Sequence, residues 1–152
     1  HMQNPIELLE LLGKTTDRIV MWTHYYDANH ISKNRKIAKK FSPLKSLQYK
    51  NFSYHAAQQH YNEGRLLVAL LSRLFPSLLR RVKIGWTGFC GGPLPTSIWL
   101  TRESIISYLK FIGFTEIKIS FESMDHPNGP SFNLCATRVL SRRPDEGAAQ
   151  FA

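Results

Sequence analysis

The chain has 152 residues, of which 43% are hydrophobic, 12% aromatic and 20% charged, and this is the size and balance of one globular domain. The composition excludes a disordered or fibrous chain, and no apolar run approaches the ~20 residues that a membrane-spanning helix needs. Cys90 and Cys135 lie far apart, and the first residues show no secretory leader, so we expect a cytoplasmic protein with no membrane association.

The formal net charge of +9 comes from one part of the chain. Residues 28–98 hold 12 Lys and Arg against one acid, Glu63, which leaves eight basic and ten acidic residues elsewhere. Aromatic residues such as Phe41, Tyr49 and Tyr54 lie between these basic residues. Such a segment favours either contact with phosphate or another anionic partner, or a solvated loop face that keeps the protein in solution. The sequence leaves both readings open.

The first elements are a short helix and a strand. Residues 4–12 carry a helical apolar face, with Asn4 as a candidate N-cap, Pro5 at the first helical position and Gly13 as the end. Residues 18–23 form a nearly continuous apolar run, which predicts a parallel-sheet strand that is buried on both faces. His24-Tyr25-Tyr26-Asp27 follows at its carboxyl end, where ligands bind in open α/β sheets.

The basic segment shows weaker patterns. Residues 28–48 have no clear period and are predicted to be irregular or weakly helical. Residues 54–79 carry clustered leucines and predict a helix that Pro76 interrupts. The glycines and prolines of residues 85–95 predict a loop. The segment is therefore expected to be mainly helical.

The last third predicts a helix and a β-hairpin. A helix over 103–112 has Thr101 as its N-cap, with Ser104 at the third helical position, and ends at Gly113. Apolar and polar side chains alternate along residues 114–122, which predicts a strand with one more polar face. Residues 132–140 are predicted to form a second strand after the turn at 125–130. The short connection makes these two strands antiparallel. Residues 141–152 are expected to be a flexible tail.

Several strings carry a family resemblance. They are Trp22-Thr23-His24-Tyr25-Tyr26-Asp27, Gly88-Phe89-Cys90-Gly91-Gly92-Pro93 with Trp99-Leu100, Gly113-Phe114, and His126-Pro127-Asn128-Gly129-Pro130. With the order of elements, they resemble the C-terminal half of a class I S-adenosylmethionine-dependent methyltransferase. The resemblance implies an α/β fold: part of a Rossmann-like methyltransferase sheet, in which 19–23 is strand five and lies beside the strand six and seven hairpin of 114–140. Residues 1–152 would be one partial methyltransferase domain, with 28–98 as an insertion that caps the substrate.

The chain departs from this family at the cofactor site. Class I methyltransferases hold S-adenosylmethionine with a glycine-rich turn after the first strand and an acidic residue that ends the second. Neither feature is present, because the glycine cluster at 85–92 precedes a loop. The resemblance implies a substrate-facing portion that is inactive alone, with S-adenosylmethionine as the cofactor of the complete enzyme but not bound by this chain alone. The cofactor-binding residues are unknown.

Candidate site residues follow the predicted strand and flank the last helix. His24 or Asp27 could orient or deprotonate a substrate group, which makes them the candidate catalytic residues. The alternative for this segment is that His24 hydrogen-bonds a loop and Tyr25 packs. The candidate substrate-binding residues are Tyr25, Tyr26, Trp99, Arg102, His126 and Asn128.

Two of these candidates have plain structural alternatives. His126 and Asn128 lie in a Pro-Asn-Gly-Pro turn sequence, which needs no functional explanation. Arg102 could bind a substrate anion or pair with a nearby carboxylate. The histidines form no HxxxH or HExxH pair and the cysteines are single, so no metal site is predicted.

A rival function is a non-catalytic basic module in which residues 33–83 bind nucleic acid or an acidic protein partner. A partial sheet would also expose a strand edge, so we expect a homo-oligomer that forms through that edge. The methyl acceptor cannot be named from the residues.

Overall fold

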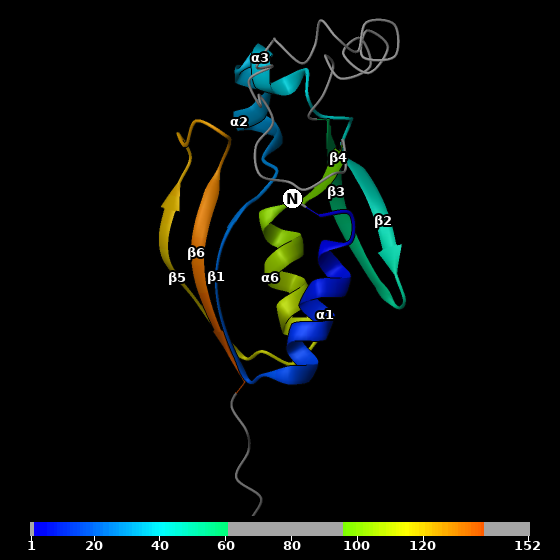
Figure 1. Cartoon of the computed structure of the whole chain (residues 1–152), viewed down its shortest axis with the longest axis vertical. Coiled ribbons are helices and arrows are strands. Elements are labelled where there is room, and N and C mark those ends of the chain that lie inside the picture. The colour runs from blue at the N-terminus through cyan, green and yellow to red at the C-terminus, as the bar shows by residue number, and fades with distance from the viewer. Residues whose placement is uncertain (1, 61–95, 139–152) are drawn as a thin grey trace, which may run out of the picture.

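The computed structural model describes residues 2–60 and 96–138. These residues form a mixed α/β structure in which two three-stranded antiparallel sheets lie on either side of helices α1 and α6 (Figure 1). In chain order the elements are α1 (Pro5–Thr15), β1 (Arg18–His24), α2 (Ala28–Lys33), α3 (Arg35–Ala38), β2 (Lys45–Tyr49), β3 (Phe52–His60), β4 (Thr96–Leu100), α6 (Arg102–Phe111), β5 (Glu116–Ser123) and β6 (Ser131–Thr137).

The first sheet has the strand order β1-β6-β5. The hairpin of β5 and β6 is confirmed, and so is its position beside residues 19–23, because Ile19 pairs with Ala136 and Thr23 with Phe132. The predicted parallel pairing of β1 is wrong within the described residues, since all of its ladder to β6 is antiparallel. Burial on both faces is also wrong. Val20 is 76% exposed while Ile19 is 5% exposed, because only one face of the sheet is covered by helices.

The second sheet, β2-β3-β4, was not predicted. The helix expected over 54–79 is wrong at 54–60, where β3 pairs with β2 on one side and β4 on the other. Lys50 supplies the tight β2–β3 turn with a φ of 52°. The described part of the basic segment thus holds two short helices and two full strands, and is not mainly helical. The remainder of the predicted helix, the glycine-rich loop and the tail at 141–152 lie outside the described residues.

Helices α1 and α6 form the layer between the sheets (Figure 1). Helix α1 continues past Gly13 to Thr15, so the predicted end at Gly13 is wrong. A Cβ on Gly13 would lie 2.8 Å from Ile112 Cδ1, so glycine allows the two helices to approach closely. The ends predicted for α6 are confirmed: the Thr101 hydroxyl accepts the Ser104 amide, and Gly113 follows the helix with a φ of +101°.

One hydrophobic core joins the helices to both sheets. It includes Ile6 and Leu9 of α1, Leu109 of α6, Leu134 of β6 and Ala56 of β3. Because each helix contributes to the same core, the strand ends above them are held in a fixed relation. Among the described residues no helix has both the length and the hydropathy to cross a membrane.

Candidate functional site

The candidate site lies where β1 ends, beside the turn between β5 and β6 and the end of β4 (Figure 1). Beyond β1, the Tyr25 amide donates to the Pro130 carbonyl at 3.0 Å, and the Tyr26 amide donates to the Leu100 carbonyl at 2.8 Å. Tyr26 and Thr101 form a parallel bridge. The main chain of residues 25–26 thus connects the two sheets at this end of the molecule.

His24 is held at this junction through one ring nitrogen. Its Nδ1 lies 3.0 Å from the Gly129 carbonyl oxygen and 3.2 Å from that of Pro130. Carbonyls only accept, so Nδ1 carries the proton and Nε2 carries the lone pair. Nε2 is buried and has no hydrogen-bond partner among the described residues. Burial lowers the pKa of His24 below 6.5, against the opposing effect of the two carbonyls, so the imidazole is neutral at pH 7.

Aromatic rings surround the His24 imidazole. Trp99 stacks on it with 5.0 Å between ring centroids, Trp22 meets it edge-on at 4.8 Å, and the His126 ring lies 4.8 Å away. A Cβ on Gly129, which has a φ of +118°, would lie 3.1 Å from the Trp99 ring. The turn therefore approaches Trp99 at a distance that requires glycine.

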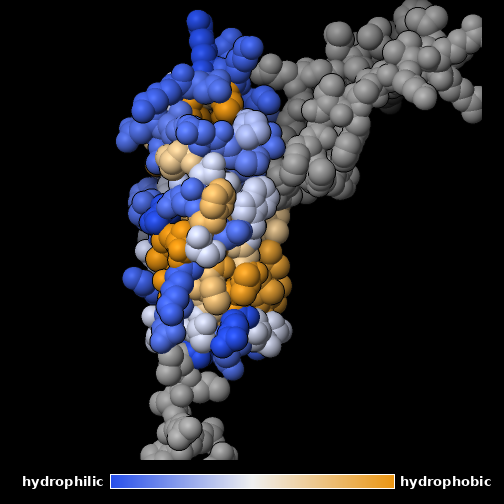
Figure 2. Space-filling view, turned by 90° about the vertical axis from the view of Figure 1, so that its left-hand side faces the viewer, coloured by the Kyte–Doolittle hydropathy of each residue, from blue (hydrophilic) through white to orange (hydrophobic). Residues whose placement is uncertain are grey.

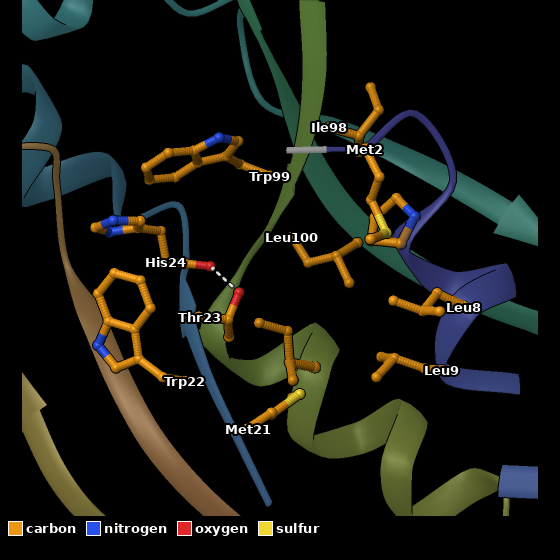
Figure 3. Close-up of a pocket in the computed structure, with 12 residues that line it drawn as sticks. Met2, Leu8, Leu9, Met21, Trp22, Thr23, His24, Ile98, Trp99 and Leu100 are labelled. Atoms are coloured by element: carbon orange, nitrogen blue, oxygen red, sulfur yellow. Dashed lines mark hydrogen bonds between the residues drawn. The ribbon is translucent and has the colours of Figure 1, made fainter. Parts of the chain in front are cut away.

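A pocket of about 200 Å³ opens beside these rings, between α1, β1 and β4. Figure 3 shows Trp22, His24 and Trp99 at one side of it and Leu8 and Leu9 of α1 at the other. The remaining lining residues are Met2, Pro5, Met21, Thr23, Ile98, Leu100 and Ile105. Among the described residues, His24 is the only titratable side chain in this lining, and most of the other lining residues are apolar.

Tyr25 points away from this pocket into a charged network. Its hydroxyl donates to Glu122 Oε1 at 2.7 Å, and Arg102 binds the same carboxylate through Nε at 2.9 Å and Nη2 at 3.3 Å. Burial raises the pKa of Tyr25, and the Arg102 guanidinium lowers the pKa of Glu122. Of the two roles open for Arg102, the structure gives it the carboxylate pair. Glu122 itself was not predicted, because it reads as the polar position of an alternating strand.

The other predicted site residues have structural contacts. Asp27 Oδ1 accepts the His30 amide at 2.7 Å and caps α2. The Tyr26 ring packs edge-on against Phe41 at 5.4 Å. His126 Nδ1 accepts the Asn128 amide at 3.2 Å, which closes the turn, and the Asn128 side chain is exposed. The structure thus brings together His24, Trp99 and His126 of the predicted set, and adds Trp22, which was not among the predicted site residues.

No protein-family model and no curated protein sequence matches the chain. Among solved structures, the N-terminal domain of EvdMO1 with SAH bound is similar, with a TM-score of 0.52 and 17% identity over 91% of this chain and 41% of that one. The same domain in the presence of SAH and D-fucose also has a TM-score of 0.52 at 17% identity, over 91% of this chain and 42% of that one. The chain spans about two fifths of the length of these structures. It therefore shares the mixed α/β fold of part of a domain that was solved with SAH bound.

Proposed function

We propose that this chain is the acceptor-binding portion of an S-adenosylmethionine-dependent methyltransferase. The observation that carries the proposal is the neutral His24 imidazole, whose Nδ1 is bound to two carbonyls while its buried Nε2 has no partner among the described residues. His24 is also part of the lining of the apolar pocket. The fold supports it, since the solved domain with SAH bound is similar over most of the chain. The order β1-β6-β5, with the hairpin beside residues 19–23, is the arrangement that the family resemblance implies.

The described residues do not fit the whole cofactor. The pocket beside His24 has about 200 Å³ and no carboxylate in its lining, whereas ligand pockets usually have ~300–1,000 Å³ and a ribose needs an acidic partner. We therefore propose that this chain binds only the methyl acceptor. The remainder of the cofactor site belongs, in this proposal, to a further part of a longer protein or to another chain.

His24 would act on the proton of the acceptor. A hydroxyl or amine of the acceptor that donates to Nε2 gives up its proton to that nitrogen as the group becomes a nucleophile. The Gly129 and Pro130 carbonyls, which accept from Nδ1, stabilise the imidazolium that results. The rings of Trp22 and Trp99 exclude water from the imidazole and restrict the position of the acceptor.

The face of the first sheet that points away from the helices is where the proposed further part would lie. Val20 is 76% exposed, Trp22 49% and Phe121 56% on this face, and hydrophobic residues gather over its middle (Figure 2). β1 is also an edge strand of the described sheet. Such a face and edge favour contact with more protein. The chain covers 41% of the solved domain, and the uncovered remainder of that domain would correspond to the proposed further part.

Isothermal titration calorimetry with S-adenosylmethionine tests the assignment of the cofactor. We expect no measurable binding to this chain and clear binding to a longer product of the same gene, or to a mixture with the chain that supplies the other part. Tight binding to the present chain would contradict the assignment of the cofactor site elsewhere. Failure of every longer form to bind would remove the methyltransferase proposal.

Substitution of His24 tests the chemistry in the assembled enzyme. We expect His24→Ala to lower kcat by ~10²–10⁴-fold, which is the usual contribution of a general base. His55→Ala is the matched control, because His55 is exposed on β3 and its described hydrogen bonds are made by its backbone amide and carbonyl. Equal turnover of both variants would remove His24 from the reaction.

In the absence of the further part, we propose that two copies of the chain pair through their β1 edges. Analytical ultracentrifugation should give a dimer at high concentration. Val20→Lys should dissociate it, because the added charge lies on the exposed face of the edge strand. Lys118→Arg, on the far strand of the same sheet, is the control. A monomer at all concentrations would contradict this pairing.

The second candidate function is a basic binding module. It is favoured by the exposed side chains of Lys33, Arg35, Lys36, Lys39 and Lys40 on and beside α2 and α3. If these bind a polynucleotide, affinity should fall steeply as salt rises, since bound phosphates release counterions. A flat salt dependence, or the absence of binding at low salt, would dismiss this candidate.

A further inference from the structure

A basic depression lies at the same end of the molecule as His24. It has a volume of about 480 Å³ and lies between helices α2 and α3 and the turn that follows β5. Lys33, Arg35 and Lys36 line it from the helices, and Asp125, His126 and Pro127 line it from the turn. Hydrophilic side chains cover the molecule over α2 and α3 (Figure 2).

The cations of this depression are not neutralised by the described protein. None of Lys33, Arg35 and Lys36 has a carboxylate within ion-pair distance among residues 2–60 and 96–138. The lining contains one carboxylate, Asp125, which is exposed and is outnumbered by these three cations. By contrast, Arg102 and Arg138 are each paired with an acid. A concave surface with unpaired cations attracts an anion.

The local structure fixes the backbone that carries these cations. Asn34 stands between the two short helices, and its Oδ1 accepts the amides of Lys36 at 3.1 Å and Ile37 at 3.3 Å. Asp27 caps the first helix by accepting the His30 amide. The two caps fix the backbone of the α2–α3 corner, which follows the end of β1 directly in the chain.

His126 connects the depression to the aromatic cluster. It lines the depression, and its ring lies 4.8 Å from the His24 ring. In our inference, a molecule whose reacting group lies at His24 extends past His126 toward the three cations. Two subsites, one apolar and one basic, suit a molecule with an apolar or sugar-like end and an anionic end.

We infer that the depression lined by Lys33, Arg35 and Lys36 binds a phosphate or diphosphate group of a small methyl acceptor. The inference rests on the proposed function and adds the substrate class to it. Phosphate suits the site because lysine and arginine side chains can surround its several oxygens with charge-assisted hydrogen bonds. A polynucleotide is less suited, because it needs a groove of several nucleotides, whereas Lys39 and Lys40 continue the chain without lining the depression.

Titration of the present chain with inorganic pyrophosphate tests the inference, with amide NMR shifts as the readout. We expect shifts centred on residues 30–37 and 125–127. The double variant Lys33→Ala/Lys36→Ala should weaken binding about tenfold or more, since two charge-assisted contacts are lost. The matched control is Lys39→Ala/Lys40→Ala, which removes the same charge outside the lining and should weaken binding less than about twofold, as expected of screened charges.

Equal weakening by the two double variants would overturn the inference, because it would show attraction to net charge alone. Absence of pyrophosphate binding at low salt would overturn it as well. A single-stranded oligonucleotide is titrated in parallel. Binding of the oligonucleotide that is tighter than that of pyrophosphate, and equally reduced by both variants, would assign the basic surface to a polymer and also overturn the inference.

The outcome separates this inference from the proposed function. Pyrophosphate binding to the present chain requires no methyl transfer, and His24→Ala should leave it unchanged within about twofold, since His24 does not line the depression. If pyrophosphate binds but no assembled form transfers methyl groups, the function fails and the anion site stands. If the assembled enzyme is active and Lys33→Ala/Lys36→Ala leaves the KM of its acceptor unchanged, the anion site fails and the function stands.

Discussion

The two ends of the first sheet differ in how completely their polar groups are paired. At the end where β1 begins, the Arg138 guanidinium donates to a carbonyl of α1 and to a carbonyl at the end of α6. At the end where β1 finishes, the buried His24 Nε2 and Ser131 Oγ have no partner among the described residues. Unpaired buried polar atoms destabilise a fold, so they persist where a ligand or another protein group completes them. The comparison separates an end that holds the fold together from an end that is available for binding.

Arg138 is the central residue of the paired end. Its Nη2 donates to the carbonyls of Gly13 and Ile112, both at 2.9 Å, and its Nη1 binds Asp17 at 3.0 Å. Its guanidinium also lies over the Phe114 ring, 5.0 Å from the centroid. One side chain thus joins the ends of α1 and α6 to the start of β1.

Substitution of Arg138 is expected to lower the stability of the fold more than any other change proposed here. Arg138→Ala leaves two carbonyls and Asp17 without their donor, so the free energy of unfolding should fall by about 2–3 kcal/mol. Urea denaturation measures it. Arg18→Ala, an exposed arginine at the same end, is the control and should change little. Equal losses in the two variants would mean that the paired end is not held by these bonds.

Gly129→Ala tests the other end through its backbone. The φ of +118° is unfavourable for alanine, and the new Cβ would lie 3.1 Å from the Trp99 ring. We expect a loss of about 1–2 kcal/mol of stability, together with a change in tryptophan fluorescence as Trp99 moves from His24. Asn128→Ala, in the same turn but exposed, serves as the control. If Gly129→Ala were neutral in both measurements, the close approach of the turn to Trp99 would be wrong.

Tyr25→Phe removes one bond from the network that borders the site. The buried hydroxyl donates to Glu122, which remains paired with Arg102, so stability should fall by only about 1 kcal/mol. Tyr26→Phe is the matched control, since no hydrogen bond of the Tyr26 hydroxyl is described. A larger loss for Tyr26 than for Tyr25 would show that the network with Glu122 contributes nothing.

The pH dependence of stability gives the smallest and sharpest test of the binding end. The pKa of His24 is lower in the native state than its ordinary value of 6.5. Between the native pKa and 6.5, the unfolded chain therefore binds more protons than the native protein. Stability due to His24 is therefore full above pH 6.5 and is lost as pH falls through the native pKa. NMR titration should place the His24 pKa below 6.5, and His24→Asn should flatten the fall of Tm from pH 7 to pH 5. A His24 pKa above 6.5 would mean that the ring is solvated or paired with an anion.

The helix α6 and the hairpin could be predicted because local signals determine them. Thr101 and Gly113 mark the ends of α6, and the alternation from Glu116 to Phe121 marks a strand with one wet face. The second sheet could not be predicted in this way. Residues 54–60 include Ala56, Ala57 and two glutamines, which carry little β preference, and they become a strand because β2 and β4 pair with them.

The candidate site was predictable only in its position along the chain. The polar group after the first strand indicated His24, but the sequence could not show which partners each side chain would find. Asp27 caps a helix and Tyr25 joins Glu122, which lies 97 residues away, so neither faces the pocket. Trp22 was not predicted as a site residue, because its apolar character fitted a buried strand. Its pairing with Asn133 of β6 places it on the exposed face of the sheet.

Under the proposed function, the parallel bridge between Tyr26 and Thr101 affects how the preference for an acceptor could change. His24 and Trp99 each lie close in sequence to this bridge, so main-chain bonds contribute to the spacing of their stacked rings. The pocket wall contributed by Leu8 and Leu9 of α1 carries no part of that bridge. Exchanges on the α1 wall could therefore reshape the cavity for acceptors of different bulk while the imidazole keeps its orientation.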